Sequence, residues 1–291
     1  MKGWLIVNGF VRSEKFDELY GFFKRAAEKK NVCLSVVKTD ELICPANDDF
    51  SSFTLPDFAV FWDKDVNLAK RLEQAGLPLF NSAKSIALCD NKIYTAVSLS
   101  GKVPSPETVP VPKTFEGVGY TSFDFLDKAI KILGLPIVIK EAYGSFGNQV
   151  YLAESFEQAK NILLKIAPKE CLLQRFVKSS CGKDVRINVV GGKIAACMLR
   201  TNKNDFRSNV TGGGTATIYE PTDEQKAVAL KACEVLGLDF AGVDVLFGEN
   251  GKPLVCEVNS NPHFKSVFDC TGVDLSKIII DYCVDKLNGK L

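Results

Sequence analysis

The first hundred residues alternate between two hydrophobic patterns. Short apolar runs at residues 4–7, 32–37 and 58–62 are typical of buried strands. Residues 16–30 place apolar side chains three and four positions apart, which predicts an amphipathic helix. Strands that alternate with helices favour a parallel sheet. We therefore predict a small α/β domain with a parallel sheet over residues 1–100.

Residues 101–121 interrupt this alternation. They are rich in proline and glycine, which predicts a connection between folded parts. Residues 122–177 again predict helices and strands in a compact central lobe. A hinge-like stretch at residues 178–182 opens a C-terminal lobe that covers residues 178–291. The predicted fold class is α/β: a small parallel-sheet domain followed by two α+β lobes.

The composition argues against several classes of protein. Lysine and arginine total 36 against 35 aspartate and glutamate, so we expect no nucleic-acid partner. The uncharged stretch at residues 3–11 is too short to cross a membrane and is not a convincing signal peptide, so we expect a cytoplasmic protein without a membrane partner. Ten cysteines without a C-x-x-C pair and a single histidine favour reduced thiols over disulfides or zinc.

Two carboxylates and one amide lie close together in the C-terminal lobe. Glu257 and Asn259 are two positions apart on a predicted strand and therefore share a face. A turn at residues 249–251 folds that strand back beside Asp244. Three such oxygen ligands suit Mg²⁺, which usually shares its shell with nucleotide phosphates. The alternative is an ordinary hairpin with solvent-facing polar residues, although burying an unpaired carboxylate in apolar strands is costly.

Basic side chains occur beside glycine-rich loops. Lys140 ends an apolar run and precedes a loop that contains Gly144 and Gly147, and such an arrangement can bind phosphate. Asp184 and Arg186 are two positions apart on a predicted strand and therefore share a face. Three more polar residues precede a run of three glycines: Arg200, Arg207 and Asn209. This grouping suits a site where a polyphosphate meets a carboxylate, and the alternative is a set of surface cations.

Eight short motifs occur in a fixed order. They are Asp90-Asn91-Lys92 with Thr95, Val138-Ile139-Lys140, Gly144-Ser145-Phe146-Gly147, Gln174-Arg175-Phe176-Val177, Gly182-Lys183-Asp184-Val185-Arg186, Phe206-Arg207-Ser208-Asn209, Gly242-Val243-Asp244 and Glu257-Val258-Asn259-Ser260-Asn261-Pro262. In this order they resemble the RimK-type branch of the ATP-grasp ligases, over about residues 75 to 285. The resemblance implies the ATP-grasp fold, in which two α+β lobes enclose ATP.

The resemblance also implies roles for individual residues. The residues that would bind ATP are Lys92, Lys140, Gly144, Ser145, Gly147, Gln174, Arg175, Phe176, Val177, Asp184, Arg200 and Asn209. Among these, the lysines would contact phosphates, the run from Gln174 to Val177 would lie against adenine, and Asp184 would face the ribose or the metal. Arg200, Arg207 and Asn209 would bind the γ-phosphate or the acyl group. Arg186 and Arg207 are the catalytic candidates, and Asp244, Glu257 and Asn259 would hold two Mg²⁺ ions, for which Mn²⁺ could substitute.

The reaction implied by the resemblance is ATP-dependent joining of a carboxylate to an amine through an acyl phosphate. L-glutamate or another amino acid would be the donor, and a small molecule, peptide or protein would supply the carboxylate; a homo-oligomer is also consistent with it. The alternatives are an ATP-grasp enzyme that cyclises a ribosomal peptide or transfers phosphoryl groups, and a nucleotide-binding protein without catalysis. Two departures from the family pattern are Arg175, where an acid is usual, and the sequence after Pro262. That sequence contains His263, either a general base or a structural residue.

Overall fold

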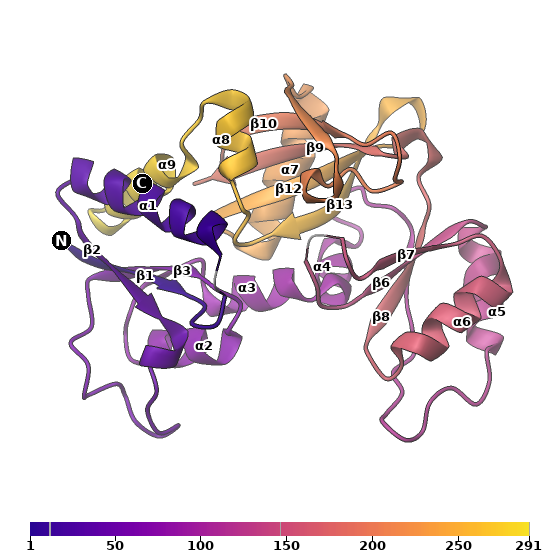
Figure 1. The fold of residues 1–291 in the computed structure, drawn as a ribbon, viewed down its shortest axis with the longest axis horizontal. Coiled ribbons are helices and arrows are strands. Elements are labelled where there is room, and N and C mark those ends of the chain that lie inside the picture. The colour runs from indigo at the N-terminus through magenta and orange to yellow at the C-terminus, as the bar shows by residue number, and fades with distance from the viewer. Residues whose placement is uncertain (12, 146, 291) are drawn as a thin grey trace.

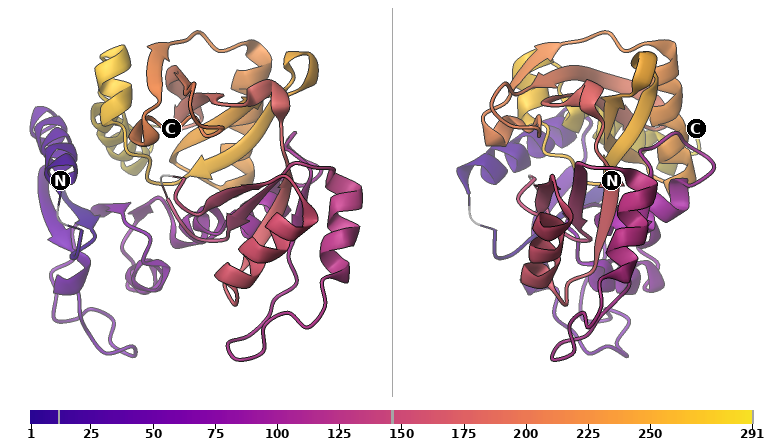
Figure 2. Two further views of the ribbon diagram at one scale, coloured as in Figure 1. Left: turned by 45° about the vertical axis from the view of Figure 1, so that its right-hand side comes forward. Right: turned by 90° about the vertical axis from the view of Figure 1, so that its right-hand side faces the viewer.

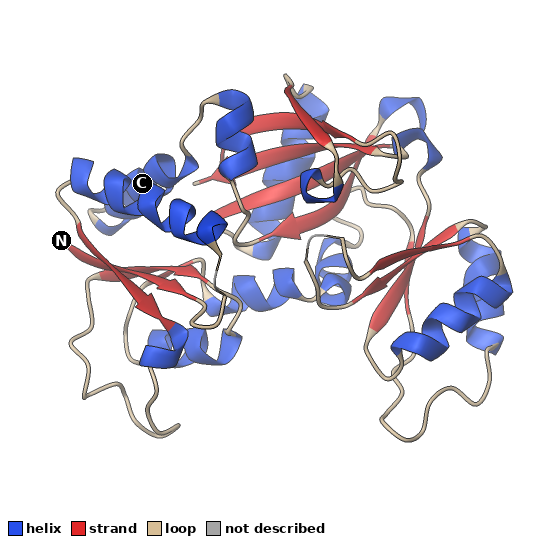
Figure 3. Ribbon diagram, viewed as in Figure 1, coloured by secondary structure: helices blue, strands red, loops and turns tan. Residues whose placement is uncertain are grey.

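Three β-sheets follow one another along the chain in the computed structural model, which describes residues 1–11, 13–145 and 147–290 (Figure 1). In Figure 1 the N-terminal sheet lies at the left, the central sheet at the right, and the C-terminal sheet above and between them. Figure 3 shows helices packed against each of the three sheets.

The N-terminal sheet has the strand order β2-β1-β3-β4, and all its neighbouring strands are parallel. Its strands are β1 (Lys2–Val7), β2 (Cys33–Lys38), β3 (Phe58–Trp62) and β4 (Leu79–Phe80). The prediction of a small parallel sheet is confirmed. Helix α1 (Glu14–Lys29) buries Leu19, Phe22 and Phe23 on the face that the spacing predicts.

Helix α2 (Val66–Gln74) connects β3 to β4, and two further helices lead from this sheet toward the central sheet: α3 (Ala83–Asp90) and α4 (Lys92–Leu99). The hydrophobic pattern did not predict α3 and α4, because each spans only eight residues and they follow each other almost directly. Asn91 separates them. Its buried side chain accepts hydrogen bonds from the backbone N–H groups of Ile93 and Tyr94 at 2.9 and 3.2 Å, which caps α4.

The central sheet is antiparallel, with the order β5-β8-β6-β7. Its elements are β5 (Thr108–Pro110), α5 (Asp124–Leu133), β6 (Ile137–Glu141), β7 (Val150–Ala153), α6 (Phe156–Ile166) and β8 (Cys171–Arg175). Strand β5 lies inside residues 101–121, for which the sequence predicts only a connection. It is an edge strand, where a terminal proline costs no ladder hydrogen bond.

The C-terminal sheet is also antiparallel, with the order β11-β10-β9-β12-β13. Its elements are β9 (Lys183–Val190), β10 (Lys193–Thr201), β11 (Thr215–Ile218), α7 (Asp223–Leu236), β12 (Phe240–Phe247), β13 (Pro253–Asn259), α8 (Lys265–Thr271) and α9 (Leu275–Leu287). Short 3₁₀ turns occur at Thr39–Glu41, Lys178–Ser180, Val210–Gly212 and Glu249–Gly251.

The N-terminal and C-terminal sheets share one hydrophobic core. Trp62 of β3 stacks on Phe240 of β12, with ring centroids 5.4 Å apart, and meets Phe264 edge-on at 5.9 Å. Helix α9 lies beside α1 (Figure 1), and both views of Figure 2 show the C-terminal sheet above the central sheet. The central sheet has a separate core that includes Leu126 and Leu173. The core shared by the N-terminal and C-terminal sheets joins the first and last parts of the chain. The domain boundaries that the sequence suggests stay a prediction.

None of the helices that the structure describes combines the length and the apolar character needed to span a bilayer.

Candidate active site

A cleft lies between the central and C-terminal sheets, with a volume of about 110 Å³. We call it the main cleft. It collects fifteen of the residues that the sequence analysis singles out, namely Lys92, Lys140, Gly144, Ser145, Gly147, Gln174, Arg175, Phe176, Val177, Asp184, Arg200, Arg207, Asn209, Asp244 and Glu257. Arg186 and Asn259 line a neighbouring cavity of about 300 Å³, which we call the second cavity. Several of the fifteen, among them Ser145, Arg200, Asn209 and Glu257, line both spaces.

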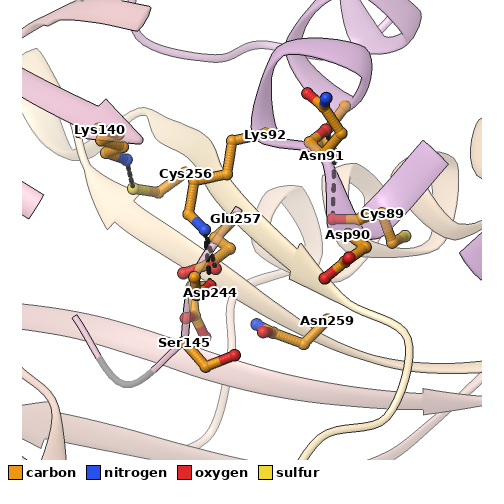
Figure 4. Close-up of polar contacts among 12 residues, drawn as sticks. Cys89, Asp90, Asn91, Lys92, Lys140, Ser145, Asp244, Cys256, Glu257 and Asn259 are labelled. Atoms are coloured by element: carbon orange, nitrogen blue, oxygen red, sulfur yellow. Dashed lines mark hydrogen bonds and ion pairs between the residues drawn. The ribbon is translucent and has the colours of Figure 1, made fainter. Parts of the chain in front are cut away.

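The three predicted metal ligands lie on one β-hairpin. Asp244 of β12 is directly opposite Glu257 of β13, and Gly242 is opposite Asn259. The pairing predicted from the spacing and the turn is therefore present. Figure 4 shows the side chains of Asp244, Glu257 and Asn259 close together on this hairpin.

Asp244 is also bound to two arginines. Arg186, its neighbour across the β9–β12 pair, forms a two-point contact with its carboxylate, and a nitrogen of Arg200 lies 3.0 Å from Oδ2. The Asp244 residue is only 4% exposed. Burial would raise the pKa of its carboxyl, but the two guanidinium groups hold the pKa below its ordinary value. Asp244 is therefore ionised and balances the charge of the arginines.

Arg200 connects Asp244 to Asp184. Its Nε and a terminal nitrogen donate to the two carboxylate oxygens of Asp184 at 2.7 and 2.5 Å. Burial opposes the charge of Arg200, but the two aspartates raise its pKa further. The resemblance assigns Asp184 to the ribose or the metal, whereas here its carboxylate is occupied by Arg200. The positive charges of Arg186 and Arg200 are likewise balanced by the carboxylates of Asp244 and Asp184.

Glu257 is less constrained than Asp244. Its side chain is 31% exposed, and its Oε1 lies 3.7 Å from the ammonium nitrogen of Lys92. The amide nitrogen of Asn259 donates a long hydrogen bond of 3.4 Å to the carbonyl of Gly242. The amide oxygen of Asn259 takes no part in this hydrogen bond. A carboxylate and an amide oxygen suit a hard divalent cation. Within the described parts of the chain, however, no cluster of three His, Cys, Asp or Glu is arranged to hold a metal alone. The residues therefore fit a cation that takes its other ligands from water and phosphate.

Three cations contact Gly144, Ser145 and Gly147 of the glycine loop, and Phe146 of the same motif lies outside the described residues. Lys92 donates to the carbonyl of Gly144 at 2.8 Å, and Arg207 donates to the carbonyl of Gly147 at 2.7 Å. Lys64 lies 3.3 Å from the hydroxyl of Ser145. Gly144 and Gly147 have φ angles of +141° and +76°, which other residues rarely adopt. Phosphate oxygens that enter the main cleft would compete with these loop groups for Lys92 and Arg207.

Lys140 lies in the wall of the main cleft and is 7% exposed. Its ammonium nitrogen is 3.2 Å from the sulfur of Cys256, a contact drawn in Figure 4. Burial would lower the pKa of Lys140, but the neighbouring Cys256, Glu257 and Asp244 raise it overall. A charged lysine is therefore held inside the cleft, and among the described residues no carboxylate oxygen lies within ion-pair distance of its ammonium nitrogen.

The end of the main cleft beside β8 combines main chain with apolar side chains. Arg175 directs its guanidinium to Glu107 and to the carbonyl of Ile132, so we assign to it only a main-chain role in the cleft. The apolar lining includes Val138, Val150 and Leu246. Val138 stands in one of the eight motifs, but the sequence analysis assigned none of the three to the site. Apolar strand residues give no signal that separates a ligand-facing position from a core position. Cys256 and Lys183 were also missed as lining residues.

His263 lines the second cavity. Its ring meets Phe16 edge-on with centroids 5.6 Å apart, and its Nε2 lies 3.4 Å from the carbonyl oxygen of Lys15. Burial, together with the charge of Lys15, lowers the pKa of His263 to about 4. The imidazole is therefore neutral near pH 7 and a weak base. This geometry favours the structural role over the role of general base.

Comparison with known proteins places this site in a class. Residues 98–283 match the model of the RimK-like ATP-grasp domain. Over its whole length the structure resembles ATP-grasp proteins of known structure. A RimK domain protein from Sphaerobacter thermophilus has a TM-score of 0.73 at 21% identity and covers 97% of this chain and 99% of its own. A D-alanine–D-alanine ligase from Bacillus anthracis, solved with ATP, has a TM-score of 0.74 at 20% identity, with 99% and 97% covered. The fold is therefore the ATP-grasp fold, as predicted.

Relatives in sequence narrow the class further. Human N-acetylaspartylglutamate synthase A is 34% identical over 238 residues, which are 81% of this chain and 60% of that protein. Beta-citrylglutamate synthase B of Danio rerio is 32% identical, with 79% and 56% covered. A protein of Halorhodospira halophila named probable alpha-L-glutamate ligase is 34% identical, with 73% and 69% covered. The chain spans about three fifths of the two synthases. It belongs to the RimK-like ATP-grasp family, whose members use ATP with a divalent metal.

Proposed function

We propose that this protein is an ATP-dependent carboxylate–amine ligase that adds L-glutamate to a carboxylic acid. The observation that carries the proposal is the meeting of Lys92, Lys140 and the carboxylate of Glu257 in one cleft, beside a second cavity large enough for a small acid. Glutamate as the amine donor is supported by the relatives, since their names include glutamate ligase and two glutamate-conjugate synthases.

The first chemical step transfers a phosphoryl group. A carboxylate oxygen of the acceptor attacks the γ-phosphorus of ATP, the bond from that phosphorus to the β-phosphate oxygen breaks, and ADP and an acyl phosphate form. Lys92 and Lys140 neutralise charge that accumulates on the phosphates, so the contribution of the protein is mostly positioning and electrostatic. We propose that Glu257, Asn259 and an oxygen of Asp244 hold two Mg²⁺ ions, or Mn²⁺ in their place, which would supply further charge neutralisation.

The second step forms the amide bond. The amine nitrogen attacks the acyl carbon, and the resulting oxyanion needs a cationic donor nearby. Arg207 and Arg186 border the two spaces and are the candidates for this contact. The oxyanion then collapses, the carbon–oxygen bond to phosphate breaks, and the amine proton passes to solvent. Closure of the glycine loop would keep water away from the acyl phosphate.

Trapping of the intermediate tests this function. Hydroxylamine offered in place of the amine should convert the acyl phosphate to a hydroxamate, while ADP and phosphate accumulate in equal amounts. A Glu257→Gln variant is the matched control and should release no ADP above background. Stoichiometric AMP and pyrophosphate would refute the proposal, because they require attack at the α-phosphorus. A peptide product that has lost one water would point instead to a peptide-cyclising ATP-grasp enzyme.

A further inference from the structure

A lysine of the N-terminal sheet reaches the site, although it lies outside residues 98–283. Lys64 follows strand β3, and its ammonium nitrogen lies 2.6 Å from Oδ1 of Asp90 and 3.3 Å from the hydroxyl of Ser145. No motif in the sequence drew attention to this residue. Its two partners belong to segments that border the main cleft, so a part of the chain far away in sequence contributes charge there.

The backbone around Lys64 is fixed by its neighbours. One carboxylate oxygen of Asp63 accepts hydrogen bonds from the N–H groups of Lys64 and Asp65 at 2.6 and 2.8 Å. Asp65 in turn caps helix α2 by accepting from the N–H of Leu68 at 3.0 Å. Asp63 is buried. The side chain of Lys64 therefore starts from a well-defined position instead of a mobile surface loop.

Lys64 lies where the spaces of the site meet. It lines the second cavity together with Ser145, Glu257 and Asn259. It also lines a small pocket with Lys92 and Glu257. Ser145 borders both the main cleft and the second cavity. A carboxylate that lies in the second cavity can therefore reach a phosphate in the main cleft past Ser145, which Lys64 contacts.

We propose that Lys64 binds the reacting carboxylate of the acceptor acid and orients it toward the γ-phosphate. This inference rests on the proposed ligase function and adds a binding residue to it. An ammonium group has three N–H donors. Asp90 takes one and sets the direction of the side chain, and the contact with Ser145 is long enough for a carboxylate oxygen to replace it.

Electrostatics explains why a cation is needed at this point. The carboxylate and the triphosphate repel each other as they approach. The two arginines that border the second cavity are buried and held by two-point contacts with aspartates, whereas Lys64 has a single carboxylate contact, with Asp90. Lys64 has a side chain that is 36% exposed, so an entering anion can reach it. It would attract the acid through its charge and hold one oxygen, while the other oxygen faces phosphorus.

The kinetic test compares two lysines with similar surroundings. Lys30 forms an ion pair of 3.1 Å with Asp281 and has a side chain that is 41% exposed, but it lies away from the site. Lys64→Met should raise the KM for the acceptor acid at least about tenfold, the loss expected for one contact of about 1.4 kcal/mol. Its KM for ATP should stay within about threefold, Lys64→Arg should recover most of the loss, and Lys30→Met should match the parent. An unchanged KM for the acid, or an equal rise in both KM values, would overturn the inference.

A labelling experiment tests whether an acid binds at Lys64 when no reaction takes place. The full-length protein is treated with limiting acetic anhydride, in the presence of Mg²⁺ and a non-hydrolysable ATP analogue, with and without N-acetyl-L-aspartate or citrate. Acetylation of Lys64 and Lys30 is then quantified by peptide mass spectrometry. The acids should slow acetylation of Lys64 at least about fivefold and leave Lys30 unchanged. Equal labelling of Lys64 with and without acid contradicts the inference, whereas absence of ADP release with every acid in a parallel assay with ATP contradicts the ligase function.

Discussion

Replacing Asp244 or Glu257 by its amide should separate stability from catalysis, although the two carboxylates face each other across one hairpin. Asp244 is buried between Arg186 and Arg200. Removing one partner of a buried ion pair costs about 3–5 kcal/mol, because the remaining charge is left uncompensated. Glu257 is one-third exposed and 3.7 Å from Lys92, so its loss should cost about 1 kcal/mol or less.

Thermal unfolding followed by circular dichroism measures this difference. About 1 kcal/mol corresponds to roughly 2–4 °C in Tm for a chain of this size, so Asp244→Asn should lower Tm by on the order of 10 °C. Glu257→Gln should lower it by less than about 4 °C and yet abolish ADP release. The reasoning fails if both variants lose the same stability, or if Glu257→Gln retains ADP release within about threefold of the parent in saturating Mg²⁺.

The remaining predictions concern nucleotide affinity, pH and metal. Lys140→Ala should raise the KM for ATP by about 10- to 100-fold, or about 1.4–2.8 kcal/mol, in steady-state assays of ADP release; an unchanged KM combined with a lower Tm would make Lys140 structural. Because the pKa of His263 is about 4 in the folded protein and higher when it unfolds, the unfolded state binds more protons between these values, and stability falls as pH is lowered from 7 toward 4. In urea titrations His263→Gln should reduce the loss between pH 7 and pH 5 by about 1 kcal/mol after allowance for solvent screening, and an unchanged loss would show that His263 is not its source. A chelator should stop ADP release, and either Mg²⁺ or Mn²⁺ should restore it; full activity in excess chelator would refute the metal site.

Hydrophobic spacing over short segments predicted the N-terminal sheet and the hairpin that carries the candidate metal ligands. The parallel N-terminal sheet follows from apolar runs separated by a helix. The position of Asp244 opposite Glu257 follows from the alternation of side chains along a strand and from the turn that joins the two strands. The sequence missed helices α3 and α4 because each is short. It also missed strand β5, which forms only when β8 is beside it.

Contacts between distant segments account for what the sequence did not reveal in the site. The binding of Asp244 by Arg186 depends on the pairing of β9 with β12, and no local spacing encodes that register. Lys64 reaches Ser145 across 81 positions of sequence. Leu246 lines the main cleft, yet it has the same character as a core residue. Sequence reasoning therefore identifies the residue types of the site more readily than the partners that set their charge.

The core shared by the first and last sheets has a consequence for synthesis on the ribosome. Trp62 is made early, but its aromatic neighbours Phe240 and Phe264 emerge much later. At about 5–20 residues per second, the N-terminal sheet waits on the order of 10 to 40 s for them. The central sheet needs no such partner, since its own core is complete once Leu173 has been added. The middle of the chain can therefore fold first, and during the interval the apolar surface around Trp62 that α1 leaves uncovered stays exposed to solvent.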